Sequence, residues 1–415
     1  MTRLSRAGSC NRLCLIPDEG SRRSKRRARP VSHVADAHML AVANPTACSG
    51  RLECVNLQRE GEIVKVETLL PLGKVDPGLR AVETPLDISR VGADARLVEE
   101  MGYDGLVTEE TKDDPYVVMA LAAQATTRLR LVTGVAMAFP RSPTITAMSA
   151  WSLQKLSKGR FTLGLGSQVK GHIQRRFGMN WSPPGPWMRE YVLAVRAIWA
   201  AWQTGAPLDV KGAHYNINLM VPLFTPAPIE HPAIPVHLAA VNPYMCQIAG
   251  EVAEGIRPHP VCTPKYIEEV MLPSVRKGAT KVSRKLDHFA VCIKPLVATA
   301  PNERALRMVI EDVRARVAFY ASTPAYTAAF EAHGFGDLAK ELATYSRAKR
   351  WNEMAALIAD DVLHTYATIG TWDEIVDKLR ERYGRIVTHA EFSIPIGSTD
   401  DKIRLMKMVD QLKAA

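Results

Sequence analysis

The sequence predicts an α/β fold, a (β/α)8 TIM barrel with a helical insertion before the last strand. The first observation is a strand–helix–strand unit, in which apolar runs at residues 129–138 and 160–165 flank a segment of helical period, 144–156. A unit of this length joins two parallel strands of a buried sheet. The second observation is that strands and helices keep alternating in one continuous series until eight strands have passed.

Each expected strand is a short apolar or alternating run that ends in turn-forming residues. The eight strands are expected at residues 64–70, 106–108, 129–138, 160–165, 235–240, 255–259, 289–298 and 389–394. Helices are expected between them, because apolar residues recur there at a spacing of three and four. These helices are expected at residues 85–101, 115–126, 144–156, 187–202, 243–253, 264–277, 303–320, 372–383 and 400–413, with 324–364 as mostly helical inserted material.

A doubly wound sheet with a dinucleotide site is the alternative fold. Gly164 and Gly166 resemble part of its glycine fingerprint, but Val169 stands where the third glycine is needed. The two glycines also follow the fourth strand, whereas the fingerprint follows the first. The chain contains no Walker loop, HExxH or GxSxG motif. The barrel therefore explains the pattern better.

Composition narrows the class of protein. The chain has 415 residues, of which 47% are hydrophobic and 23% charged, so a large core can form. No apolar run approaches the roughly 20 residues of a membrane helix. The first 65 residues hold 12 basic and 6 acidic residues, and the other 350 hold 41 basic and 37 acidic residues. The charge of this larger part is nearly balanced, which does not indicate nucleic-acid binding. The seven cysteines include no CxxC pair, so we expect no metal site and a reducing, cytoplasmic location.

Residues 1–63 form a separate problem, because they show no sustained period and carry a polybasic run at 21–30. We expect a disordered basic extension before a barrel at 64–415. A second hypothesis makes this segment an artefact of gene prediction. Purine-only codons for residues 59–62 would resemble a ribosome-binding site, and translation would then begin near Val64.

Several motifs resemble the bacterial luciferase-like monooxygenase superfamily. They are Leu156-Ser157-Lys158-Gly159-Arg160-Phe161 with Gly164-Leu165-Gly166, Asp104-Gly105 and Arg141-Ser142-Pro143. Segments 175–179 and 318–326 are similar to the branch that uses the deazaflavin coenzyme F420. The resemblance covers about residues 64–397. It implies a (β/α)8 barrel that binds F420 or FMN at the carboxyl ends of its strands and forms a homodimer.

Three residues are candidates for catalysis. Glu109 and Glu110 end the second strand, where the resemblance implies a polar pair with a histidine beside the coenzyme ring; here the histidine is absent. One of the two carboxyl groups could act as a general acid, or it could cap the next helix or pair with Lys112. His259, fixed between two prolines, could contact coenzyme or substrate, or be structural.

Two strand ends are candidates for contact with the coenzyme ring. The resemblance implies a cis peptide at Gly134–Val135 that bulges against the ring; the alternative is a small residue packed inside the barrel. Gly164, Gly166 and Ser167 would let backbone amides approach a ligand closely, or would simply form a tight turn.

The charged end of the coenzyme has further candidates. Lys170 and Arg175 could contact the phosphodiester and polyglutamate tail that the resemblance implies, or form a solvated basic helix face. The backbone of Ala240, Val241 and Asn242 could hold a phosphate at a helix start. Asn242-Pro243 is also a good helix N-cap, and both roles are compatible.

These features together predict an oxidoreductase that transfers a hydride between F420 and a small organic substrate. The alternatives are an FMN-dependent luciferase-like monooxygenase and a non-enzymatic F420-binding protein. We expect a homodimer without nucleic-acid or membrane partners.

Overall fold

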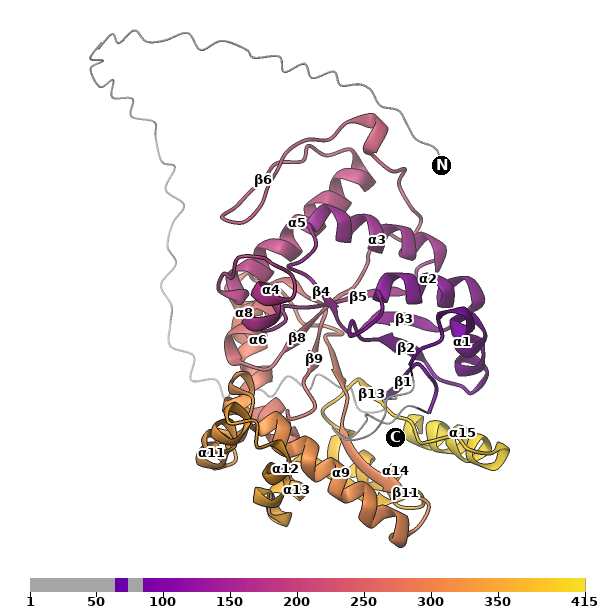
Figure 1. The fold of residues 1–415 in the computed structure, drawn as a ribbon. Helices are drawn as coiled ribbons and strands as arrows, with labels where there is room; N and C mark the ends of the chain where they lie inside the picture. Colours follow the sequence, from indigo (N-terminus) through magenta and orange to yellow (C-terminus); the bar gives the residue numbers. More distant parts are fainter. Residues whose placement is uncertain (1–63, 74–84, 415) are drawn as a thin grey trace, which may run out of the picture. The chain divides into compact units, whose positions relative to one another are not determined.

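The computed structural model describes residues 64–73 and 85–414 (Figure 1). The expected extension at 1–63 lies outside the described residues. Strands at the centre form a parallel barrel, as predicted. They are β1 (Lys65–Leu69), β2 (Gly105–Thr108), β3 (Arg130–Thr133), β4 (Ala136–Met137), β5 (Phe161–Gly166), β8 (Val236–Ala240), β9 (Gly255–Pro258), β10 (Ala290–Ile293) and β13 (His389–Glu391).

The strands follow the order β3-β2-β1-β13-β10-β9-β8-β5-β4, and a further pairing of β3 with β5 closes the barrel. Every ladder in this sheet is parallel. The expected single strand at 129–138 is in fact two, β3 and β4, with a cis peptide at Gly134–Val135 between them. Both pieces pair with β5, so the break changes the course of the strand without opening the barrel.

The helices lie around these strands (Figure 1). They are α1 (Val91–Glu100), α2 (Pro115–Ala125), α3 (Pro143–Leu156), α4 (Lys170–Arg175), α5 (Pro184–Thr204), α6 (Pro243–Val252), α7 (Pro264–Tyr266), α8 (Leu272–Lys281), α9 (Glu303–Ala321), α14 (Ile375–Tyr383) and α15 (Thr399–Lys413). A polar N-cap followed by proline starts four of them, with Asp114, Ser142, Asn242 and Thr263 as the caps. Each cap accepts a hydrogen bond from an otherwise unbonded N–H of the first turn, which places the helix start.

The predicted strand at 289–298 is also two strands, which corrects the prediction. β10 belongs to the barrel, whereas β11 (Leu296–Ala300) leaves it and pairs with β12 (Ala367–Thr371), a strand that the sequence did not reveal. The helical insertion before the last strand is present as α10 (Thr327–Glu331), α11 (Gly336–Arg347), α12 (Trp351–Met354) and α13 (Asp360–Tyr366). In Figure 1 the orange helices α9, α11, α12 and α13 gather together beside the barrel.

A small hairpin, β6 (Val210–Lys211) with β7 (Asn216–Ile217), follows α5 and was not predicted. Its two-residue strands are too short to show a period. Within residues 64–73 and 85–414, none of the helices has the length and apolar character needed to cross a bilayer.

Candidate active site

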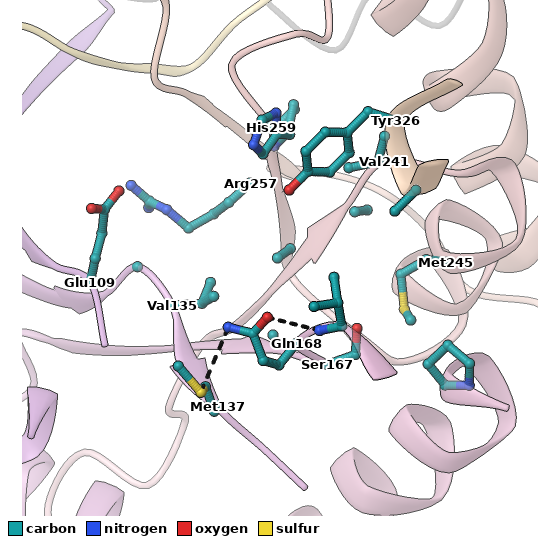
Figure 2. Close-up of a pocket in the computed structure, with 18 of the residues that line it drawn as sticks. Glu109, Val135, Met137, Ser167, Gln168, Val241, Met245, Arg257, His259 and Tyr326 are labelled. Carbon is teal, nitrogen blue, oxygen red and sulfur yellow. Dashed lines mark hydrogen bonds between the residues drawn. The ribbon is translucent and has the colours of Figure 1, made fainter. Parts of the chain in front are cut away.

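A cavity of about 590 Å³ lies at the carboxyl ends of the barrel strands. At β10 and directly after it, alternate residues line the cavity, namely Cys292 and Lys294, as expected for a strand whose alternate side chains face the barrel interior. At the end of β9 the four consecutive residues 257–260 line it, Arg257 and His259 among them. Figure 2 shows Glu109 and Arg257 on one side of the cavity, Met245 on the opposite side, and His259 with Tyr326 between them.

Glu109, which follows β2, is held by an ion pair across the cavity mouth. The Lys294 ammonium donates to Glu109 Oε1 at 2.8 Å and lies 3.6 Å from Glu391 Oε1. The three side chains come from β2, β10 and β13, so the barrel brings together residues that are far apart in the chain. This cluster can exchange a proton with a bound molecule, since a carboxylate accepts a proton and an ammonium gives one.

Glu110 lines the cavity, yet its carboxylate is used for structure. It accepts from Met137 N at 2.7 Å and from Arg141 Nη1 at 2.7 and 2.9 Å. Arg141 also pairs with Asp114, the N-cap of α2, at 2.8 Å. A carboxylate with these three hydrogen bonds to two partners fixes β4 and the loop after it, and has little freedom to act on a ligand.

Arg257 and Glu67 form a buried ion pair inside the barrel, with Nη2 donating to Glu67 Oε2 at 2.6 Å. Burial is the largest single influence and raises the pKa of Glu67, but the charge and hydrogen bond of Arg257 together with His389 and Arg130 hold that pKa below its usual value. The other amino nitrogen of Arg257, Nη1, is buried and has no hydrogen-bond partner among the described residues. Arg257 lines the cavity, so this N–H is available to a bound molecule.

His259 forms part of an aromatic wall. Its ring stacks on Tyr326 with centroids 3.9 Å apart and meets the edge of Tyr320 at 4.6 Å. Burial raises the pKa of Tyr326 to about 12, so this hydroxyl is neutral at physiological pH. Tyr326 belongs to the insertion after β11, which therefore helps to shape the cavity.

The glycines at the strand ends differ in their position. Gly134, Val135 and Gly166 line the cavity, and a Cβ on Gly166 would lie 2.5 Å from Val135 Cγ2. Gly164 is outside the lining: a Cβ there would lie 1.8 Å from Thr133 O, so glycine lets β3 and β5 approach each other. Ser167 lines the cavity beside Gln168, whose amide contacts Met137 Sδ and Val169 N (Figure 2).

Of the residues predicted to bind the charged end of a ligand, some line the cavity and one does not. Lys170 lines the cavity at the start of α4, whereas Arg175, in the last turn, falls outside the lining. Ala240, Val241 and Asn242 all line it. Asn242 Oδ1 accepts from Met245 N at 2.9 Å as the N-cap of α6, so its side chain fixes this helix start beside the cavity.

The sequence analysis missed several lining residues that the barrel brings to the cavity. They are Met137, Gln168, Trp181, Met245, Arg257, Cys292, Lys294, Tyr326 and Glu391. The two-residue period at the strand ends could have found Arg257, Lys294 and Glu391. Trp181 and Tyr326 come from loops and an insertion, where no period indicates the direction of a side chain.

Comparison with known proteins gives three findings. The family model of luciferase-like monooxygenases matches residues 72–389. Uncharacterized protein Rv1360 of Mycobacterium tuberculosis is 41% identical over 303 residues, which are 73% of this chain and 89% of that protein. Rv3520c of the same organism, provisionally named a coenzyme F420-dependent oxidoreductase, is 28% identical over 295 residues, 67% of this chain and 82% of that protein.

Among solved structures, the coenzyme F420-dependent tetrahydromethanopterin reductase from Methanopyrus kandleri has the same fold, with a TM-score of 0.63 and 22% identity. The similarity covers 84% of this chain and 97% of that one. A parallel eight-stranded barrel with its cavity at the carboxyl ends of the strands is the architecture of TIM-barrel enzymes. The chain belongs to the luciferase-like monooxygenase family. The family and its relatives are monooxygenases and oxidoreductases, which supports an enzyme of this kind.

Proposed function

We propose that this chain is an oxidoreductase that transfers a hydride between coenzyme F420 and a small organic substrate. The observation that carries the proposal is the cavity of about 590 Å³ at the carboxyl ends of the strands. It occurs in a chain 28% identical to a protein provisionally named as F420-dependent. Cavities of roughly 300–1,000 Å³ are typical of sites for cofactors and small ligands.

The residues present fit such a coenzyme. Gly134, Val135 and Gly166 line the cavity, and the Val135 side chain lies over Gly166, where an added Cβ would come 2.5 Å from Val135 Cγ2. Val135 thus presents an apolar surface against which a flat ring can pack. Lys170 supplies positive charge at one part of the lining, and Arg257 supplies an unused N–H at another. The negative charge of such a coenzyme can pair with Lys170, and a carbonyl of its ring can accept a hydrogen bond from Arg257.

F420, when bound, supplies the hydride chemistry. The chain positions the reactants and manages a proton. At the mouth, Lys294 Nζ donates a hydrogen bond to Glu109 Oε1 at 2.8 Å, so that a proton donor and an acceptor stand side by side. Val135, Met137 and Met245 give the cavity apolar lining, against which the ring of a coenzyme can pack.

Titration of the purified protein with F420 and, separately, with FMN tests the proposal. We expect F420 to bind roughly tenfold or more tightly than FMN. With F420 bound, we expect the coenzyme to be oxidised or reduced by at least one member of a panel of alcohols, ketones and unsaturated acceptors. Preference for FMN together with oxygen consumption would instead support the luciferase-like monooxygenase. Tight F420 binding without turnover across the panel would support a non-enzymatic F420-binding protein.

The homodimer and the cytoplasmic location stay predictions. Analytical ultracentrifugation at micromolar concentration distinguishes a dimer from a monomer. Fractionation of cells that express the native gene tests the location.

A further inference from the structure

One buried cation in the barrel has bonding capacity that the fold does not use. Arg257 is only 8% exposed, and its Nη2 is bonded to Glu67. Nη1 is buried and has no hydrogen-bond partner among residues 64–73 and 85–414. A buried polar group without a partner is costly, and each such group in a folded protein calls for an explanation.

The position of Arg257 indicates where a hydrogen-bond partner for its Nη1 would come from. The side chain projects from β9 into the cavity, and Figure 2 shows its guanidinium end directed toward the side where Glu109 lies. Its Nε is 3.2 Å from the position that a Cβ on Gly134 would take. The absence of a side chain at Gly134 thus lets the guanidinium lie directly against the wall formed by the Gly134–Val135 peptide.

Glu67 alone does not account for an arginine here. A lysine could supply one cation to that carboxylate, whereas a guanidinium supplies a planar set of donors that can serve two acceptors at once. The neighbouring Cys292 offers no negative charge, because burial raises the pKa of its thiol to about 12. Nη1 has no acceptor among the described residues, and Arg257 lines the cavity, so a molecule bound there can supply the second acceptor.

We propose that Nη1 of Arg257 binds an oxygen that carries negative charge, namely a carboxylate or an electron-rich carbonyl of the molecule in the cavity. Such an oxygen has two sources, a carboxylate or ketone of the substrate and a ring carbonyl of the coenzyme. Charge-assisted bonds from arginine to oxygen are the strongest hydrogen bonds of this type. The coenzyme source rests on the proposed function; the substrate source does not.

Two substitutions separate this role from simple pairing with Glu67. Arg257→Lys keeps a cation beside Glu67 and removes the second donor. Glu67→Gln, the matched control, removes the ion pair and leaves the guanidinium intact. Circular dichroism and thermal melting establish that each variant folds. Benzoate binding to the protein without coenzyme is measured by calorimetry, and F420 binding is measured by coenzyme fluorescence.

We expect Arg257→Lys to weaken binding of the molecule that supplies the oxygen by about tenfold to a hundredfold. Weaker F420 binding with unchanged benzoate binding assigns the oxygen to the coenzyme; weaker benzoate binding assigns it to a carboxylate substrate. Glu67→Gln should bind that same molecule, benzoate or F420, several times more tightly than the wild type, since it removes the carboxylate that neutralises Arg257. A purely structural pairing would not produce these opposite changes.

The proposal is overturned if Arg257→Lys binds both probes within about twofold of the wild type, or if the wild type binds neither. If Arg257→Lys does not fold, Glu67→Gln decides, and binding of both benzoate and F420 that is unchanged or weaker overturns the proposal. A wild-type protein that binds benzoate but not F420 contradicts the proposed function alone. The benzoate measurements then still test Arg257.

Discussion

At the scale of single residues, Glu109 and Glu110 are adjacent in the chain but have different environments. Glu110 bonds to Met137 N and Arg141, whereas Glu109 contacts Lys294 at the cavity mouth. The sequence alone offered both as the acid. We propose Glu109 as the acid, with Lys294 as the next proton donor, because both line the cavity while the Glu110 carboxylate is occupied by Met137 N and Arg141.

Glu109→Gln should leave F420 binding within a few fold of the wild type and lower hydride-transfer turnover by at least roughly a hundredfold. A positioned acid or base typically contributes ~10²–10⁴-fold, and glutamine keeps the shape but not the titrating proton. Stopped-flow coenzyme fluorescence, with a substrate that the wild type turns over, measures both quantities. Glu391→Gln, which changes a carboxylate 3.6 Å from the same lysine, is the control and should have a smaller effect. Unchanged turnover in Glu109→Gln would assign the proton to Lys294.

Lys170→Ala should weaken F420 binding by several fold at low salt, and the loss should shrink as salt is added. Lys170 lines the cavity, and its attraction to an anionic tail is screened by ions. Arg175→Ala is the matched control and should lose less, since Arg175 lies outside the lining. Titrations at two salt concentrations measure this. An equal loss for a deazaflavin that lacks the phosphate and glutamates argues against a role in binding the tail.

At the scale of secondary-structure elements, the turn before β5 explains why Lys158-Gly159-Arg160 stands where it does. Lys158 and Gly159 both have positive φ, at 53° and 87°. Arg160 then donates to Leu129 O at 2.6 Å and to Thr126 O at 2.9 Å, carbonyls that follow α2. This turn lies at the amino end of β5, opposite the cavity. This part of the family motif therefore stabilises the barrel and lies outside the cavity lining, whereas Gly166 at the end of the motif lines the cavity.

The seam between β3 and β5 gives an element-scale prediction. Thr133 Oγ1 bonds to both the N–H and the carbonyl of Gly164, each at 2.8 Å. Gly164→Ala would place a Cβ 1.8 Å from Thr133 O, which is backbone, and should cost about 3 kcal/mol or more. Gly166→Ala meets the Val135 side chain, which can move, and should cost roughly 1 kcal/mol. Urea unfolding measures the loss of stability in both variants. Equal losses would show that the contact between β3 and β5 at Gly164 is no more tightly packed than the contact at Gly166.

At the scale of the whole molecule, buried charges inside the barrel couple its stability to pH. Burial, with the charges of Lys65 and Arg257, lowers the pKa of His389 to about 4, and burial with Arg257 lowers that of His237 well below its usual value. Both rings are therefore neutral in the folded barrel at physiological pH. In the unfolded chain a histidine has a pKa near 6.5.

The unfolded chain binds more protons than the folded one between about pH 6.5 and pH 4, so acidification through this range lowers the free energy of unfolding. The contribution of His389 should amount to about 2 kcal/mol between pH 7.5 and pH 5. His389→Asn should remove that part of the slope, as measured by urea unfolding at the two pH values. Below pH 4 a further loss is expected from Glu67, whose folded pKa is lowered by Arg257. A slope unchanged by His389→Asn would contradict this account.

The sequence by itself determined the alternation of strands and helices, because the apolar period and the capping residues before Pro115, Pro143 and Pro243 are local signals. It also placed Glu109 and Val135 at strand ends, where a parallel barrel exposes residues to a ligand. It could not show that 129–138 and 289–298 each form two strands. The first divides at a cis peptide, and the second divides because β11 leaves the barrel for β12, which is distant in the chain.

Only the tertiary structure decided which charges meet. Arg257 and Glu67 are 190 residues apart, and Lys294 and Glu109 are 185 apart. No local pattern relates them, since their distance depends on the closure of the barrel and on which face of each strand turns inward. Gly164 and Gly166 share one face of β5, but only Gly166, at the carboxyl end of the strand, reaches the cavity. Lys170 and Arg175 stand at opposite ends of α4, and only Lys170 lines the cavity. The sequence thus indicates the strand ends of the site, and the closed barrel selects the side chains that share it.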